Sequence, residues 1–176
     1  MPPAQIWTIG HSTRPLEDFL ALLRANQISR LADIRTIPQS RRHPHFAGPA
    51  LAASLASEGI EYRHFPELGG LRKPTRESPN GAWKNQSFRG YADHMSTPEF
   101  AAGLHELLSF GEGARASVMC AESVWWRCHR MLLSDAMVAL GIDVRHIVGA
   151  AEPQPHRFTE FAKVDGRGQV TYPALV

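Results

Sequence analysis

The sequence predicts an α/β fold with three layers: a mostly parallel five-stranded sheet, helices on both faces and a long inserted loop. Short apolar runs alternate with segments of helical periodicity along most of the chain, as in proteins built around parallel sheets. The length of 176 residues suits one domain with a single core. Hydrophobic residues make up 43% and charged residues 20%, which favours a folded domain over a disordered chain. We therefore predict a single domain over residues 1–176.

The first third of the chain supplies three predicted strands and two predicted helices. The apolar run 6–10 predicts the first strand, which ends in glycine. A helix follows from Pro15, with Thr13 as its expected N-cap and apolar residues recurring at helical spacing. The further elements expected here are a strand over 31–35, a loop over 36–49, a helix over 49–58 and a strand over 60–65.

Residues 67–91 form a long segment without a sustained apolar pattern. The segment is rich in Gly, Pro, Asn, Ser and Arg. Loops of this length are uncommon inside compact domains and often serve as lids or binding loops. We therefore expect an inserted loop or lid over about 67–91.

The last part of the chain resumes the alternation of helices and strands. Thr97 is the expected N-cap of the next helix, and Pro98 is its first residue. A strand over 115–121, a helix over 126–140 and a fifth strand over 143–148 follow. Residues 153–176 are predicted to be a polar C-terminal tail with a short strand at 169–172.

The composition and the N-terminal sequence bear on the expected location and partners of the protein. The net charge of +2 gives no bulk basic character that would indicate extended nucleic-acid binding. The N-terminus lacks the regions of a signal peptide, and no apolar run approaches the roughly 20 residues that span a bilayer. We expect a cytoplasmic protein without membrane contact. Its two cysteines do not make a disulfide framework, so free thiols are expected.

Chemically active side chains follow several of the predicted strands. His11 and Ser12 follow the first strand, Arg35 ends the second, and Cys120 and Glu122 lie at the end of the fourth. The carboxyl ends of parallel strands meet at one edge of the sheet, where open α/β folds bind ligands. The sequence therefore predicts a site at this edge.

Three of these residues are candidates for proton transfer. Glu122 would act as a general acid or base, or bind a substrate hydroxyl. The alternative is that Glu122 caps the following helix or pairs with an arginine. His11 and His129 would assist proton transfer, although His129 also shares a helical face with apolar residues and would fit a hydrogen-bonded core position.

Basic residues predict an anion site. Between residues 30 and 89 the chain has ten Lys and Arg against five acidic residues. Guanidinium groups bind phosphate through paired hydrogen bonds. The alternative is an ordinary solvated loop surface. The residues expected to bind an anionic, most plausibly phosphorylated, substrate are Ser12, Arg35, Ser40, Arg41, Arg89, Tyr91 and Arg130.

The cysteines allow a second kind of chemistry. A positive neighbour would make Cys120 a nucleophile, whereas a buried cysteine usually only packs. Cys120, Cys128 and His129 together could supply three metal ligands, but their spacing matches none of the usual zinc patterns. We therefore expect no metal site, and the sequence does not identify which cofactor, if any, the protein uses.

Five ordered motifs run along most of the chain. They are Thr8-Ile9-Gly10-His11-Ser12, Asp33-Ile34-Arg35 with Pro38 and Ser40-Arg41, Leu68-Gly69-Gly70, Phe88-Arg89-Gly90-Tyr91-Ala92-Asp93-His94-Met95, and Met119-Cys120-Ala121-Glu122 with Cys128-His129-Arg130. Together they resemble the bacterial DUF488 family, a domain of unknown function. The resemblance implies a small cytoplasmic α/β protein whose motif residues meet at one site, and it implies no particular reaction.

Three functional hypotheses follow. The first is an enzyme that acts on a nucleotide-like or nucleic-acid phosphate. The second is a binding module for nucleic acid or a phosphorylated ligand, without turnover. The third is thiol or metal chemistry at Cys120, Cys128 and His129. A small anionic or phosphorylated ligand is the expected partner, nucleic acid is the alternative, and the sequence does not indicate the oligomeric state.

Overall fold

Five parallel strands and one short antiparallel strand form the central sheet. The computed structural model of the protein describes residues 1–175. Neighbouring strands follow the order β3-β2-β4-β1-β5-β6, which confirms the predicted parallel sheet and adds one strand to it. The strands are β1 (Gln5–Gly10), β2 (Arg30–Asp33), β3 (Glu61–His64), β4 (Ala116–Cys120), β5 (Asp143–Ile147) and β6 (Gln154–Pro155).

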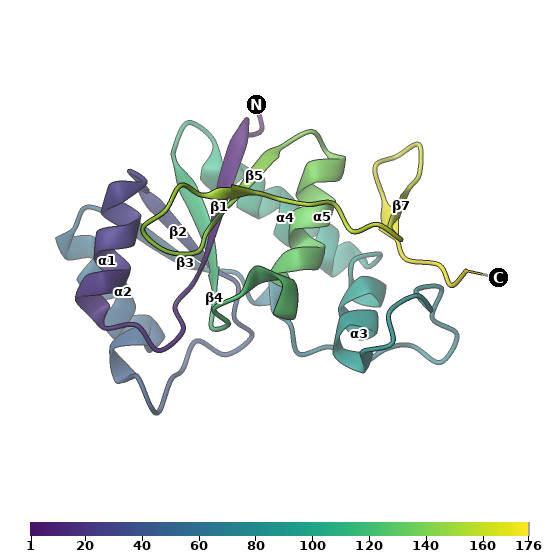
Figure 1. Cartoon of the computed structure of the whole chain (residues 1–176), viewed down its shortest axis with the longest axis horizontal. Coiled ribbons are helices and arrows are strands. Elements are labelled where there is room, and N and C mark those ends of the chain that lie inside the picture. Colours follow the sequence, from purple (N-terminus) through teal and green to yellow (C-terminus); the bar gives the residue numbers. More distant parts are fainter. Residues whose placement is uncertain (176) are drawn as a thin grey trace.

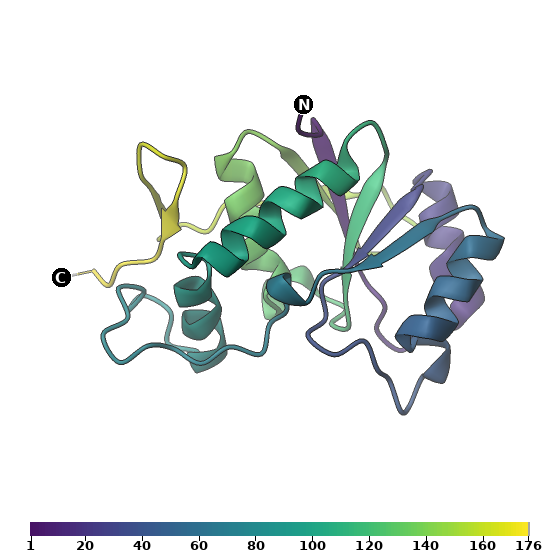
Figure 2. The ribbon, with the colours of Figure 1, turned by 180° about the vertical axis from the view of Figure 1, so that it is seen from behind.

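Helices cover both faces of this sheet and complete the three predicted layers (Figures 1 and 2). Helices α1 (Leu16–Ala25) and α2 (Gly48–Ser57) pack on one face and share one apolar core with it. The second core lies on the opposite face, against α3 (Gln86–His94), α4 (Pro98–Gly111) and α5 (Arg130–Ala139).

Strand β4 lies between β2 and β1, and its position determines where the site forms. All five of its residues are buried, because a central parallel strand is covered on both faces. The helices that follow β1 and β2 lie on one face, whereas α5 follows β4 on the other. The connection after β4 therefore crosses to one face of the sheet, whereas the connections after β1 and β2 cross to the other face. Such a divergence opens a crevice at the carboxyl edge of the strands.

Two helix starts differ from the prediction. Helix α1 begins at Leu16, and Thr13 does not cap it, because Pro15 occupies the N-cap position and has no side-chain acceptor. Helix α5 begins at Arg130 rather than at Trp126. A separate short 3-10 helix, η3 (Trp125–Arg127), precedes it, and the indole of Trp125 stacks on the His146 ring with centroids 4.3 Å apart.

The predicted loop over 67–91 is shorter than expected, because α3 begins at Gln86. Asn85 caps this helix, and its Oδ1 accepts hydrogen bonds from the backbone N–H groups of Ser87 (2.9 Å) and Phe88 (3.1 Å). The helix was not predicted because this stretch has low hydrophobicity, although its buried residues include Tyr91 and Ala92.

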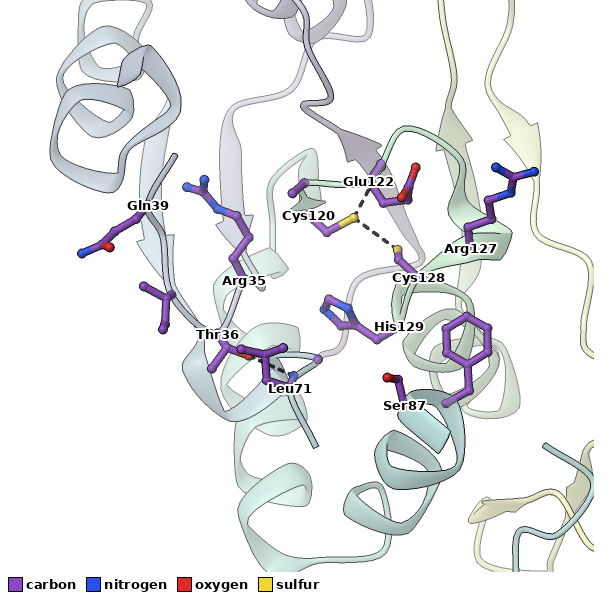
Figure 3. Close-up of a pocket in the computed structure, with 14 residues that line it drawn as sticks. Arg35, Thr36, Gln39, Leu71, Ser87, Cys120, Glu122, Arg127, Cys128 and His129 are labelled. Atoms are coloured by element: carbon purple, nitrogen blue, oxygen red, sulfur yellow. Dashed lines mark hydrogen bonds between the residues drawn. The ribbon is translucent and has the colours of Figure 1, made fainter. Parts of the chain in front are cut away.

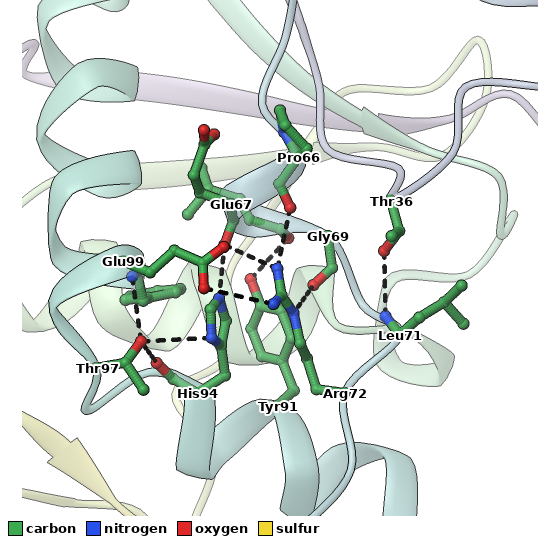
Figure 4. A network of polar contacts seen from close by, with 12 residues as sticks. Thr36, Pro66, Glu67, Gly69, Leu71, Arg72, Tyr91, His94, Thr97 and Glu99 are labelled. Carbon is green, nitrogen blue, oxygen red and sulfur yellow. Dashed lines mark hydrogen bonds and ion pairs between the residues drawn. The ribbon is translucent and has the colours of Figure 1, made fainter.

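Polar contacts hold the start of this segment against the helices around it (Figure 4). The guanidinium of Arg72 donates to the carbonyl oxygens of Pro66 (3.0 Å) and Gly69 (3.2 Å), and it pairs with Glu99 of α4. The Tyr91 hydroxyl donates to the carbonyl oxygen of Leu68 (3.0 Å). These bonds fix the backbone of the segment next to α3 and α4.

Asp135 of α5 fastens the C-terminal segment to the domain. Its buried carboxylate accepts hydrogen bonds from His156 Nε2 (2.8 Å), Thr159 Oγ1 (2.6 Å) and the Tyr172 hydroxyl (2.8 Å). The strand predicted at 169–172 is present as β8 (Val170–Thr171), paired with β7 (Lys163–Val164).

Among the helices of residues 1–175, none is long and apolar enough to cross a membrane.

Candidate active site

A pocket of about 360 Å³ opens at the carboxyl end of β4, where the connections diverge (Figure 3). Residues 35–37 and 39 after β2 line one side, together with residues 70–71 of the inserted segment. Residues 87–88 of α3, 120–122 after β4 and 127–129 before α5 complete it. The pocket therefore lies at the sheet edge where the sequence predicts a site.

Both cysteines of the chain contribute to this pocket, and their sulfur atoms lie 3.2 Å apart. Cys120 ends β4, whereas Cys128 immediately precedes the first turn of α5. The Cys128 sulfur also accepts a hydrogen bond from the backbone N–H of Arg130 (3.3 Å). A sulfur at a helix N-terminus that accepts hydrogen bonds is a favourable place for a thiolate.

The two thiols differ in acidity. The hydrogen bond from Cys120 lowers the pKa of Cys128 to about 6, and the Arg130 charge acts in the same direction against the effect of burial. Burial and this donated hydrogen bond raise the pKa of Cys120 well above its ordinary value. The opposite directions of these shifts make Cys128 the more acidic thiol of the pair.

Arg130 is a buried cation beside these sulfur atoms. Only 1% of its surface is exposed, and its guanidinium donates to the carbonyl oxygens of Glu122 (2.9 Å) and Ser123 (3.2 Å). None of the ion pairs within residues 1–175 involves Arg130. Burial disfavours its charge, yet the neighbouring cysteine sulfurs keep its pKa above the ordinary value. A thiolate at Cys128 would place a negative charge close to this buried guanidinium.

A chain of hydrogen bonds connects Arg130 to the C-terminal segment. Arg130 Nη1 donates to Thr8 Oγ1 (3.3 Å), which bonds to His146 Nδ1 (2.6 Å). His146 Nε2 bonds to His156 Nδ1 (2.8 Å), and His156 Nε2 bonds to Asp135 (2.8 Å). Burial keeps the pKa of His146 far below its ordinary value, so its ring is neutral. The chain fixes the guanidinium without placing a carboxylate against it.

Arg35 brings a second guanidinium to the pocket. Its Nε and Nη2 donate to the two carboxylate oxygens of Asp33, at 2.9 Å and 2.7 Å, and the Tyr62 hydroxyl donates to the same carboxylate. Its Nη1 lies 3.4 Å from His11 Nε2. A guanidinium carries five N–H bonds, so Arg35 retains donors for a ligand after pairing with Asp33.

The two candidate histidines are held neutral by burial. Burial lowers the pKa of His11 to about 4, and its ring stacks on Phe46 with centroids 4.4 Å apart. Burial likewise lowers the pKa of His129 to about 4, and its Nε2 donates to the carbonyl oxygen of Ile34 (3.0 Å). Neither ring carries a proton to donate as an imidazolium near neutral pH.

Residues 15–137 match the family model described as domain of unknown function DUF488. The protein belongs to the DUF488 family. This match confirms the resemblance seen in the motifs and extends from the residue before α1 into α5. The chain shows no significant similarity to a curated protein or to a solved structure. Thr8, His146 and His156, which position Arg130 in this DUF488 protein, lie outside the matched range.

The pocket of the DUF488 domain contains only some of the residues predicted for the site. Glu122, Arg35 and His129 line it, as do Cys120 and Cys128. Arg130 lies behind the cysteines and His11 behind Arg35, in contact with them but outside the lining. The predicted residues outside the pocket lining are Ser12, Ser40, Arg41, Arg89 and Tyr91. Tyr91 nevertheless packs on His129 with ring centroids 5.1 Å apart, and the backbone N–H of Ser12 donates to the carbonyl oxygen of Ala121 (3.0 Å).

The side chains outside the lining make structural contacts elsewhere in the protein. The Ser40 hydroxyl accepts the backbone N–H of His43 (3.1 Å), and Arg41 is exposed on the loop after β2. Arg89 Nε donates to the carbonyl oxygen of Trp83 (3.0 Å), and Tyr91 bonds to Leu68 as described above. The sequence places them near the carboxyl edge of the sheet but could not tell which way each side chain points.

Several pocket residues of the DUF488 domain were missed by the sequence analysis. Arg127, exposed at the pocket, directly precedes the Cys128 motif, so its position was a usable signal. Thr36 Oγ1 accepts the backbone N–H of Leu71 (3.2 Å), which joins the loop after β2 to the inserted segment. Gly70 lets the inserted segment pack closely against His129, because a Cβ there would lie 2.5 Å from His129 Nδ1.

The same DUF488 pocket offers no assembled metal site. No group of three or more His, Cys, Asp or Glu side chains in residues 1–175 is arranged to hold a metal ion. The Nε2 atom of His129 faces a backbone carbonyl oxygen. The two cysteines interact with each other and with Arg130.

Proposed function

We propose that this DUF488 protein is an enzyme that acts on a small anionic molecule, with Cys128 as its nucleophile. The observation that carries the proposal is the position of Cys128: its sulfur lines the pocket, accepts an N–H at the start of α5, and adjoins the buried Arg130. An isolated buried cation is costly, so Arg130 stabilises a negative charge on this sulfur. Thiolates, rather than thiols, are the nucleophilic form of cysteine.

The charges around the pocket support an anionic substrate. Arg35 retains N–H donors, and Arg127 is an exposed cation at the pocket. The carboxylate of Glu122 is exposed beside them and accepts the backbone N–H of Ser123 (3.0 Å). In this proposal Glu122 exchanges a proton with the substrate or its leaving group, and the neutral His129 helps to shape the wall.

The size of the pocket supports a small substrate. A volume of about 360 Å³ is at the low end of the range for small-molecule sites. Phe88, Leu71 and Ile37 add apolar surface to the walls. A charged group with an apolar body would satisfy both features, so the proposal does not extend to a nucleic-acid strand.

Replacing Arg127 with glutamine is expected to reduce the preference of Cys128 for an anionic reagent. The ratio of the alkylation rate with iodoacetate to that with iodoacetamide should fall about threefold, because a nearby exposed charge contributes only modestly in water. Mass spectrometry of the labelled peptide identifies the residue, and free cysteine corrects for the reagents' own reactivities.

Arg41→Gln is the matched control, because Arg41 is exposed on the neighbouring loop and does not line the pocket. Its ratio should equal that of the wild type. Cys128→Ser should abolish the fast labelling with both reagents. Equal ratios in Arg127→Gln and the wild type would contradict the proposed preference for an anionic substrate. Fast labelling of Cys128→Ser would contradict the proposed role of Cys128 as the nucleophile.

A further inference from the structure

We propose that Cys120 and Cys128 form a two-electron dithiol–disulfide couple and that the site reduces a small anionic disulfide. The inference rests on the proposed function, since it requires Cys128 as the nucleophile. It adds the substrate's reactive bond, a second reacting residue in Cys120 and a turnover cycle. Its physical basis is the pairing of the two sulfur atoms at the pocket wall (Figure 3).

The separation of the sulfurs allows them to bond after a small movement. They lie 3.2 Å apart, and a disulfide bond is about 2.05 Å long. Cys120 is held by the central strand, whereas Cys128 lies between the short helix η3 and α5. Residues 121–129 follow the strand without joining the sheet. The connection can therefore adjust at Cys128 while the sheet stays in place.

The surroundings give the two thiols different roles. Cys128 is the attacking residue, because its sulfur lies 3.2 Å from Cys120 Sγ, accepts a hydrogen bond from the backbone N–H of Arg130 and is the more accessible of the two. Cys120 keeps its proton and is the more buried of the pair, with 2% of its surface exposed against 9% for Cys128. The exchange begins at the more accessible thiolate, and the resolving thiol lies directly behind it.

The chemistry balances without a metal or a prosthetic group. The Cys128 thiolate attacks one sulfur of the substrate disulfide, whose S–S bond breaks, and the first substrate thiolate leaves. Cys120 then gives its proton to that thiolate and attacks Cys128 Sγ. The mixed disulfide breaks, the second substrate thiolate leaves, and a Cys120–Cys128 disulfide forms. The substrate gains two electrons, and a small dithiol reductant returns them to the protein.

Arg130 assists the second step from its buried position, where its guanidinium is held by the carbonyl oxygens of Glu122 and Ser123. Its charge lies close enough to influence the acidity of both cysteines. Once Cys128 is joined to the substrate it is no longer negative, and the guanidinium is then available to stabilise a thiolate on Cys120. The same buried cation therefore serves each thiolate in turn.

The test uses an aromatic disulfide that bears two carboxylates, 5,5′-dithiobis(2-nitrobenzoate), with the whole folded chain. One equivalent of reagent should release two equivalents of thionitrobenzoate from the wild type. The protein should lose two hydrogens in mass and retain no adduct. Peptide mapping should then find a Cys120–Cys128 disulfide. Addition of dithiothreitol should restore both thiols.

Cys120→Ser separates attack from resolution. This variant should release one equivalent and retain one thionitrobenzoate on Cys128. Cys120→Ala serves as a second variant and should give the same stoichiometry. A wild-type protein that keeps an adduct on Cys128, or adducts on both cysteines, would overturn the dithiol couple and leave the nucleophile intact. No release from the folded wild type, together with no fast alkylation of Cys128, would overturn the proposed function as well.

Discussion

Replacing Arg130 with methionine should lower the thiolate content of the folded protein at neutral pH about tenfold. The buried guanidinium lies close to Cys128, whose pKa is about 6, so its removal should raise the pKa of that thiol by about two units and lower the thiolate fraction at pH 7 from about 90% to about 10%. Methionine keeps an apolar side chain of similar length in the same space. The ultraviolet absorbance of the thiolate, measured as the difference from a Cys128→Ser protein, reports the effect directly.

Arg127→Met is the matched control for this result. It removes a positive charge from the residue before Cys128, but from an exposed side chain that water and salt screen. Its thiolate absorbance should stay close to that of the wild type. Circular dichroism establishes that both variants are folded. An Arg130→Met protein that is folded and retains the full thiolate signal would show that Arg130 does not set the acidity of Cys128.

Asp135→Asn should lower the free energy of unfolding by about 3 kcal/mol, a loss typical for a buried charged hydrogen-bond acceptor. The wild-type carboxylate is fully buried and accepts bonds from His156, Thr159 and Tyr172. Asparagine keeps one acceptor oxygen, but the amide nitrogen that replaces the other oxygen cannot accept the protons bonded there. Urea unfolding gives the free energy, and limited proteolysis should show earlier cleavage within residues 154–172.

Asp165→Asn is the control for this second prediction. Asp165 also accepts hydrogen bonds, from the backbone N–H groups of Arg167 and Gln169, but in an exposed turn between β7 and β8. Water replaces such bonds, so its unfolding midpoint should change far less than that of Asp135→Asn. Equal unfolding midpoints for Asp135→Asn and the wild type would contradict the anchoring role of Asp135.

The position of the site could be predicted from sequence because it depends on strand ends. Cys120, Glu122 and Arg35 meet at the pocket since parallel strands present their carboxyl ends on one edge. The motif around Cys128 returns to the same edge because α5 begins there. These placements follow from chain direction alone, which the alternation of strands and helices already indicates.

The directions of the side chains could not be predicted in the same way. Arg89 and Tyr91 belong to α3. This helix could not be predicted from sequence because it begins inside a polar segment. Their side chains bond to the backbone at Trp83 and Leu68 instead of reaching the pocket. Periodicity assigns a residue to an element, but the packing of that element against its neighbours decides what the residue contacts.

The contacts of Arg130 could not be predicted from sequence either, because they involve residues far away in the chain. The sequence marks it as a cation near the site, yet its guanidinium is turned inward by Thr8 and by the carbonyl oxygens of Glu122 and Ser123. Thr8 is in turn fixed by His146 on β5, a residue far away in the chain. Only the three-dimensional arrangement shows that this arginine adjoins the cysteines.

The most direct test of the central claim is the pH dependence of alkylation of the wild-type protein by iodoacetamide, with mass spectrometry to identify the labelled residue. If Cys128 is the nucleophilic thiolate, the rate should be half-maximal near pH 6, and Cys128 should be labelled first. A half-maximal rate near the value for a free cysteine, about 8.5, or labelling of Cys120 before Cys128, would contradict the account.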